Sequence, residues 1–277
     1  MIDILLSTYN GEKYIYELLE SLKEQTYKDF RILIRDDSSS DNTVGIIEKF
    51  KESNNINIEI INDNKGNIGS TASFESLVNY STADYFMFCD QDDVWLPNKI
   101  ALSINKIEEL EKKFGKNIPL LIFTNLKIVD SKLNLISESY FKYQNISPSV
   151  CYNIWKCMAL SVAAGCTMIL NKYSKEYILP IPKYLIHDHW IISNIVYWGK
   201  CDYILEPTIL YRQHNNNSVG ASSTSTKYLL NRLTTPIKWL TLYKKELGSF
   251  KFRVNYVAFI YYKLLFYFLR LFKFKLI

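Results

Sequence analysis

Four carboxylate side chains flank one short predicted strand. The strand is the apolar run 85–89, and the carboxylates belong to Asp84, Asp90, Asp92 and Asp93. In an extended chain Asp90 and Asp92 lie on the same side, and a bend after the strand lets them converge. Two carboxylates held that close repel each other unless a cation lies between them. The motif predicts a Mg²⁺ or Mn²⁺ site facing phosphate, and the alternative is a solvated acidic turn.

The three histidines are the other candidate metal ligands. His187, His189 and His214 could form a zinc site together, but the cysteines lack the spacing of zinc ligands. His214 fits better as an additional ligand of the metal held by the acidic motif. Any of the three could instead be structural or solvated.

Two tryptophans and one arginine stand beside these motifs. Trp95 follows the acidic run and Trp190 follows His189. An indole ring can stack on the face of a sugar, and it can equally pack in the core. Arg212 could meet a phosphate oxygen or form a surface ion pair, and the sequence leaves both alternatives open.

The elements that must position these residues alternate between strand and helix. The predicted strands are 2–7, 30–35, 56–61, 85–89 and 120–129. Apolar residues between them recur at helical spacing over 15–22, 44–50, 74–78 and 100–110. Ser40 or Asp41 is the predicted cap of the second helix. This alternation predicts a mainly parallel sheet with right-handed crossovers.

Polar clusters follow four of the predicted strands. They are 7–11, 36–41, 64–69 and 90–93. In a parallel α/β sheet, ligands bind beyond the carboxyl ends of the strands. We therefore expect the four clusters to meet at one rim and form a binding site there.

The second half of the chain is less regular. The small-residue run 163–170 predicts a turn that enters a strand, and 187–198 predicts a helix that Gly199 ends. A short strand is predicted over 209–214. From Lys244 to Ile277 the chain carries a local charge of +7 within a total of +5, so the basic character belongs to the tail.

The tail combines this charge with apolar and aromatic residues at helical spacing. Lys263 and Arg270 interrupt it, so it is too charged for a transmembrane helix and fits a helix that lies on the membrane surface. Alternatively, the helix docks on the chain's own core or on a second copy of the chain. Its apolar excess argues against nucleic acid binding. Five cysteines without a Cys-x-x-Cys pair, and a chain that enters a strand at once, predict reduced thiols in the cytoplasm.

Four motifs in this order resemble the inverting family-2 glycosyltransferases of the GT-A fold. They are Ser-Thr-Tyr-Asn-Gly (7–11), Asp-Asp-Ser-Ser-Ser-Asp-Asn-Thr (36–43), Asn-Ile-Gly (67–69) and Asp-Gln-Asp-Asp-Val-Trp (90–95). His-Asp-His-Trp (187–190) and Tyr-Arg-Gln-His (211–214) resemble the rhamnosyltransferase-like branch. The resemblance covers roughly residues 1–220. It implies a GT-A domain over 1–220 and a helical basic tail over 221–277.

The resemblance also implies roles for individual residues. The nucleotide would contact Ser7, Thr8, Tyr9, Asn10, Asp37, Asn67 and Asp90, with Asp37 accepting from a ring N–H of the base. The metal would bind Asp90, Asp92 and His214. The sugar or acceptor would meet Asp93, Trp95, Gly165, His187 and Trp190. Asp188 would be the general base, although His187 replaces the acidic residue that usually precedes it.

The implied activity is metal-dependent transfer of a sugar with inversion, from a nucleotide-diphosphate donor to a lipid-linked surface polysaccharide such as capsule or O-antigen. Rhamnose from dTDP-rhamnose is the first expected donor, and a UDP-hexose or UDP-N-acetylhexosamine is the alternative. The enzyme would work in the cytoplasm on the inner face of the cell membrane. Two other classes remain: a sugar nucleotidyltransferase, whose Gly-rich basic loop this chain lacks, and a non-catalytic carbohydrate-binding module.

Overall fold

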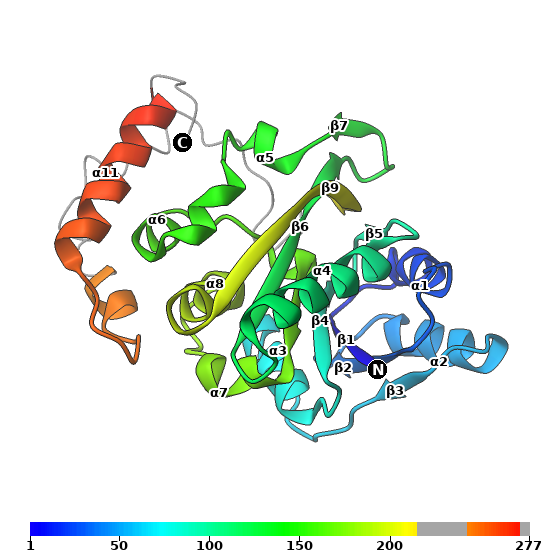
Figure 1. The fold of residues 1–277 in the computed structure, drawn as a ribbon. Coiled ribbons are helices and arrows are strands. Elements are labelled where there is room, and N and C mark those ends of the chain that lie inside the picture. Colours follow the sequence, from blue (N-terminus) through cyan, green and yellow to red (C-terminus); the bar gives the residue numbers. More distant parts are fainter. Residues whose placement is uncertain (215–242, 272–277) are drawn as a thin grey trace.

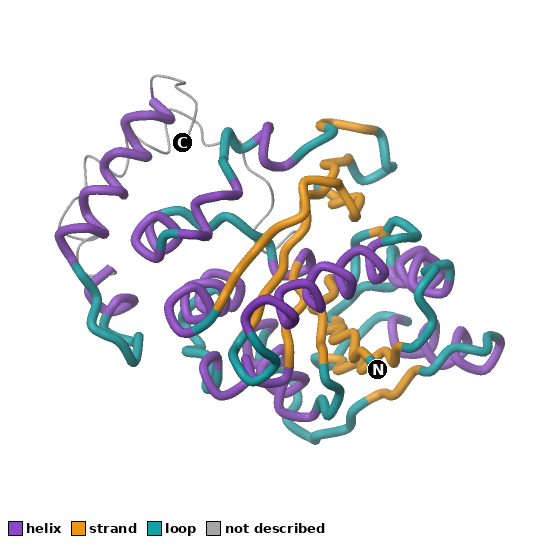
Figure 2. Tube along the Cα trace, viewed as in Figure 1, coloured by secondary structure: helices purple, strands orange, loops and turns teal. Residues whose placement is uncertain are grey.

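A single mixed sheet forms the centre of the protein in the computed structural model, which describes residues 1–214 and 243–271. Within these residues nine strands pair in the order β3-β2-β1-β4-β8-β6-β9-β5, and β7 pairs with β6. Helices lie on both sides of the sheet (Figures 1 and 2). The predicted α/β class with a mainly parallel central sheet is confirmed.

The first half of the chain follows the predicted alternation. Parallel strands β1 (Ile2–Thr8), β2 (Phe30–Asp36), β3 (Ile58–Ile60) and β4 (Tyr85–Asp90) are connected by helices α1 (Ile15–Lys23), α2 (Thr43–Ser53) and α3 (Ser70–Tyr80). Helix α4 (Lys99–Phe114) follows the acidic run. The cap of α2 was predicted at Ser40 or Asp41, but the N-cap residue is Asn42. Asp41, one residue earlier, accepts the backbone N–H of Thr43 at 3.0 Å.

The second half departs from simple parallel alternation. Strand β8 (Met168–Asn171) inserts between β4 and β6 (Leu120–Val129) and is antiparallel to both. The strand predicted over 209–214 is only the end of β9 (Lys200–Arg212), which runs parallel to β6. Polar residues and a proline in the first part of β9 concealed it in the sequence. The short strands β5 (Val94–Trp95) and β7 (Leu135–Ser137) pair with β9 and β6.

Short helices connect the later strands. They are α5 (Tyr140–Tyr143), η1 (Pro148–Tyr152), α6 (Ile154–Ala159), η2 (Gly165–Thr167), η3 (Lys172–Ser174) and α7 (Lys175–Ile178). The predicted helix α8 (His187–Trp198) is confirmed, and the N–H of Gly199 donates to Ile195 O at its end. Glycine is required there because a Cβ would overlap the carbonyl oxygen of Pro119.

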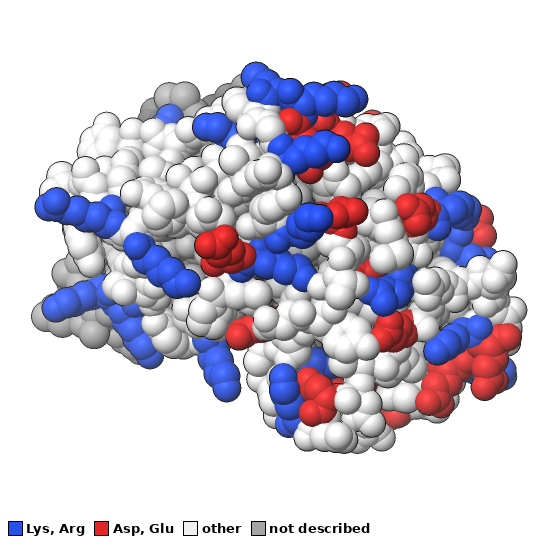
Figure 3. Space-filling view, turned by 60° about the horizontal axis from the view of Figure 1, so that its bottom comes forward, with Lys and Arg blue, Asp and Glu red and all other residues white. Residues whose placement is uncertain are grey.

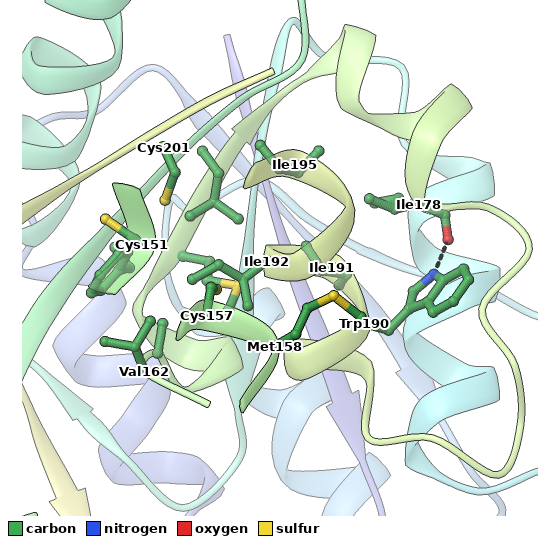
Figure 4. Packing of buried hydrophobic residues seen from close by; sticks show 14 of the residues in the cluster. Cys151, Cys157, Met158, Val162, Ile178, Trp190, Ile191, Ile192, Ile195 and Cys201 are labelled. Atoms are coloured by element: carbon green, nitrogen blue, oxygen red, sulfur yellow. Dashed lines mark hydrogen bonds between the residues drawn. The ribbon is translucent and has the colours of Figure 1, made fainter. Parts of the chain in front are cut away.

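The two faces of the sheet bury separate hydrophobic clusters. In β1, Ile2, Ile4 and Leu6 pack toward α1, α2 and α4, while Leu5 points to the opposite face. That opposite face is covered by α3, α6 and α8, and it contains Cys157, Met158 and Trp190 (Figure 4). The alternation of side chains along each strand therefore fills both layers.

The described part of the tail packs on this second cluster. Helix α11 (Tyr256–Leu271) contacts α6 and buries Phe259 and Phe266 to 2% and 4% exposure. The face of the tail helix that carries Phe259 and Phe266 therefore docks on the chain's own core, as one of the two alternatives predicted. The predicted boundary at residue 220 lies outside the described residues. No helix in the described ranges is long and apolar enough to cross a membrane.

Candidate active site

The strand register brings the predicted rim together. Ser7 pairs with Asp90 across β1 and β4, and Thr8 pairs with Asp36 across β1 and β2. The Thr8 hydroxyl donates to Asp36 at 2.7 Å, and the Asn67 side-chain amide donates to Asp37 O at 3.0 Å. The polar ends of these strands thus form one connected rim, as the sequence predicted.

A buried arginine connects the segments at the end of the rim where the sequence predicts the nucleotide. Arg35 is 1% exposed and uses all five of its N–H groups, on Asp37, Asp63, Ser73 and the carbonyl of Gly66. Its hydrogen bond to Asp63 lowers the pKa of that carboxyl to about 2. The guanidinium therefore ties the end of β2 to the loop after β3 and to α3.

Asp37 belongs to this network, and its carboxylate can accept one further hydrogen bond. Burial alone would raise its pKa, but hydrogen bonds from the Ile68 N–H, Arg35 and the Gly69 N–H lower it below the usual value. Three donors fill three of the roughly four lone-pair sites of the carboxylate. Because Asp37 also lines the cavity described below, the remaining site on Oδ2 can accept from a ligand.

Asp90, Asp92 and His214 form the acidic end of the rim. His214 Nε2 lies 2.8 Å from Asp92 Oδ2, and its ring stacks on Tyr14 at 5.0 Å between centroids. Burial, together with the charges of Asp92 and Asp188, raises the pKa of Asp90 to about 7. Two carboxylates and an imidazole are the ligand types that Mn²⁺ and Mg²⁺ accept, so the chemistry of these side chains fits the predicted metal. In the structure, Asp92 and His214 are in direct contact, and the charge of Asp92 acts on Asp90.

Asp93 lies beneath the rim rather than on it. It is 1% exposed and accepts from the Arg212 N–H at 3.2 Å, and burial raises its pKa well above the usual value. Ligand atoms of Asp90, Asp93 and Cys166 come within 4.8 Å of one another. The structure does not bring Asp93 to the cavity wall, so the prediction that it meets sugar or acceptor is wrong for this arrangement.

Asp84 and the two tryptophans lie away from the site. Asp84 stands at the opposite end of β4 and pairs with Lys172 at 2.8 Å. Trp95 is 2% exposed in the core beneath Lys99, whose Nζ lies 4.4 Å from the ring centroid. Trp190 stacks on Phe250, and its indole N–H donates to Ile178 O (Figure 4). Both indoles are core residues, so neither stacks on a sugar.

Asp188 opens α8 at the cavity wall. Its Oδ1 accepts the backbone N–H of His189 at 2.6 Å within the first turn, and the residue lines the cavity. The N-cap position belongs to Ile186, so Asp188 is not the helix cap. Next to Asp188, the His187 ring is wedged against Phe74 and Phe88, at 4.5 and 5.5 Å between centroids. Burial lowers the pKa of His187 and favours the neutral imidazole, whose Nε2 has no hydrogen-bond partner.

One cavity of about 1580 Å³ joins these groups. It exceeds the ~300–1,000 Å³ of ordinary small-ligand pockets, so it has room for two substrates. Of the predicted site residues it is lined by Ser7, Thr8, Tyr9, Asn10, Asp37, Asn67, Asp90, Asp92, Gly165, His187, Asp188 and His214. The candidate metal ligands and the candidate base thus share one space.

The sequence analysis missed several residues that shape the cavity. Gln91, between the two metal carboxylates, accepts from the Tyr9 N–H at 2.8 Å and donates to Tyr9 O at 2.9 Å. A Cβ on Gly11 would overlap the Gln91 side chain. Glu246 and Lys263, from the tail, line the opposite wall. Gln91 could have been predicted as a site residue from its position within the acidic motif, whereas no sequence pattern placed Glu246 and Lys263 at the cavity.

The fold is that of glycosyltransferases of the GT-A type. The chain matches Staphylococcus aureus TarS in complex with UDP-GlcNAc at a TM-score of 0.63 and 17% identity, over 99% of this chain and 73% of that one. A mannosyltransferase from Pyrobaculum calidifontis, in complex with GDP-Man and Mn²⁺, matches at a TM-score of 0.58 and 13% identity, over 95% and 68%.

Sequence comparison gives the family. Residues 3–162 match the model of glycosyl transferase family 2, and the chain belongs to that family. The dTDP-rhamnosyl transferase RfbG of Shigella flexneri is 30% identical over 87% of this chain and 81% of its own. The UDP-Glc:alpha-D-GlcNAc-diphosphoundecaprenol beta-1,3-glucosyltransferase WfaP of Escherichia coli is 36% identical over 41% of this chain and 43% of its own. The protein is therefore a glycosyltransferase.

The contact between Gly165 and His187 gives a first prediction. A Cβ at Gly165 would lie 2.6 Å from His187 Nε2, and the neighbouring phenylalanines leave the ring little room to move. Gly165→Ala should lower the free energy of unfolding in urea by about 1–3 kcal/mol, the usual cost of overpacking. In a His187→Ala background the same change should cost close to nothing. Equal costs in both backgrounds would contradict this packing.

Proposed function

We propose that the protein transfers a sugar, with inversion, from a nucleotide-diphosphate donor to a lipid-linked saccharide, and that the donor is dTDP-rhamnose. The observation that carries the reaction type is the single cavity shared by Asp37, the Asp90–Asp92–His214 set and Asp188. The name and coverage of the Shigella flexneri relative support the donor. The match to the glucosyltransferase of Escherichia coli favours a UDP-hexose as the second candidate.

The proposed mechanism assigns each end of the cavity one task. Asp37 accepts the ring N–H of uracil or thymine at its remaining site, and Tyr9 and Asn67 border the base. Asp90, Asp92 and His214 would hold Mn²⁺ or Mg²⁺, and the ion would supply positive charge for the departing diphosphate. Asp188 removes the proton from the acceptor hydroxyl. Direct displacement then inverts the anomeric carbon, and no covalent nucleophile is needed.

A panel of nucleotides tests the donor and the metal together. UDP, dTDP and their sugars should raise the melting temperature in the presence of Mn²⁺, and EDTA should abolish that shift. CDP should bind more weakly because cytosine lacks the ring N–H that Asp37 accepts. Asp92→Asn should reproduce the effect of EDTA. Equal binding of CDP would refute the role of Asp37, and binding insensitive to EDTA would refute the metal.

The second prediction concerns the general base. Asn at position 188 keeps an oxygen that can accept the backbone N–H of His189 but cannot take a proton. Asp188→Asn should therefore keep its melting temperature and nucleotide affinity, while the rate of transfer falls by about 10²–10⁴-fold. Near-normal turnover would leave Asp188 with a structural role in the first turn of α8 and make His187 or His189 the candidate base.

We also propose that the outer face of α11 binds an anionic bilayer near a lipid-linked acceptor. This face exposes a stripe of apolar residues at helical spacing: Val257, Ile260, Tyr261, Leu264 and Phe268. Exposed basic residues precede it, at Lys244, Lys245, Lys251 and Arg253. Figure 3 shows blue side chains without neighbouring red ones at the left end, where this segment lies. Apolar insertion and charge attraction would act together.

Vesicle binding tests this attachment. Val257→Asp combined with Leu264→Asp should abolish cosedimentation with vesicles containing phosphatidylglycerol, because both side chains point outward at 80% and 57% exposure. Binding of the unmodified chain should weaken as salt rises. Leu205→Asp, on an exposed position of β9, is the matched control. Cosedimentation that survives the double substitution would refute the attachment.

A further inference from the structure

The C-terminal segment forms part of the active-site wall. Tyr243, Glu246 and Lys263 line the same cavity as Asp188, although they lie more than fifty residues after it in the sequence. Figure 1 shows α11 on the opposite side of the molecule from β1, β2 and β3, whose ends form the nucleotide site. The segment therefore lines the end of the cavity away from the nucleotide.

A histidine beside the candidate base joins this segment to the domain. His189 Nδ1 lies 3.0 Å from Glu246 Oε1, and its Nε2 lies 3.0 Å from the carbonyl oxygen of Met158 at the end of α6. Both partner atoms accept hydrogen bonds, so the ring fills both contacts when each nitrogen carries a proton. His189 is thus held between α6 and the tail, one residue after Asp188.

The end of α6 is held from a second side as well. The Lys263 ammonium, on α11, donates to the carbonyl oxygen of Ala159 at 2.7 Å, and it lies 5.2 Å from the ring centroid of Tyr243. The last carbonyls of a helix have no partner within the helix and favour cations. His189 and Lys263 satisfy two neighbouring carbonyls of α6, so the tail and the first turn of α8 are fixed to the same point.

The wall formed in this way has the chemistry of a saccharide site. An acidic residue, a basic residue and two tyrosines line it: Glu246, Lys263, Tyr184 and Tyr243. Charged groups hydrogen-bond sugar hydroxyls, and aromatic rings pack on the apolar faces of sugars. The nucleotide and metal residues lie elsewhere, so this wall faces the second substrate.

We propose that the C-terminal segment builds the subsite for the acceptor saccharide, and that Glu246 positions Asp188 through His189. The assignment of an acceptor rests on the proposed function. Glu246 acts on the reaction through the first turn of α8 and through the bound saccharide. The tail would therefore determine which acceptor is used, while the first half of the chain determines the donor.

The test separates acceptor binding from nucleotide binding. The probe is a GlcNAc α-diphosphate ester of a short alkyl alcohol, titrated by calorimetry, with UDP and dTDP titrated in parallel. Glu246→Ala should weaken probe binding about tenfold or more, since it removes a charged hydrogen-bonding group. UDP affinity should stay within about twofold, as expected for a residue that only the acceptor contacts. Glu246→Gln should restore much of the binding, because its side-chain oxygen can accept from His189 Nδ1 as the carboxylate does.

Positioning of Asp188 has its own readout. In Glu246→Ala, backbone amides in the first turn of α8 should exchange hydrogen for deuterium faster than in the unmodified chain, and Glu246→Gln should restore their protection. Glu52→Ala, an exposed acid on α2 remote from the cavity, is the matched control for both measurements. If Glu246→Ala does not fold, Lys263→Met should show the same selective loss of probe affinity.

Several results would overturn the proposal. They are probe affinity unchanged in both Glu246→Ala and Lys263→Met, parallel loss of UDP affinity, and absence of probe binding to the unmodified chain. Failure of the unmodified chain to bind UDP or dTDP would instead refute the proposed function. The two conclusions therefore depend on different titrations.

Discussion

The Arg35 guanidinium, whose N–H groups are all paired, is the constraint that fixes the part of the site proposed for the nucleotide. It lies in the interior, and burying a cation is favourable only when its donors are paired. Its partners come from three separate places: the end of β2, the loop after β3 and the first turn of α3. Because every N–H is used, none of these segments can move without leaving a buried donor unpaired. The loops that would meet a nucleotide are therefore fixed before any ligand arrives.

The opposite physical situation holds at the acidic end. Burial and the charges of Asp92 and Asp188 raise the pKa of Asp90 to about 7. His214 Nε2 lies 2.8 Å from Asp92 Oδ2. At one end of the site a buried cation pairs with its neighbours, and at the other end carboxylates repel one another. A diphosphate held by a divalent ion would complete the second end, whereas a uracil or thymine ring would fit the first.

The sequence predicted the features that depend on local pattern. Strands that alternate with amphipathic helices pair in parallel. The order of these elements alone therefore predicted that the polar loops meet at one rim. The insertion of β8 and the full length of β9 depend on contacts between distant segments, which no local pattern encodes. Trp95 and Trp190 were assigned to sugar because they adjoin acidic motifs, but adjacency in sequence does not decide which side of an element faces the cavity. Glu246 was not found because only the packing of Phe259 and Phe266 brings the tail to the wall.

The double contact of Gln91 with Tyr9 has a consequence for exchanging parts between related enzymes. Gln91, between Asp90 and Asp92 in the sequence, holds the backbone of the first loop, and its side chain occupies the space beside Gly11. A chimera that carries the acidic tripeptide alone would bring a glutamine that needs a glycine at position 11 of the recipient. The tripeptide and the first loop therefore form one transferable unit, although eighty residues separate them in the chain.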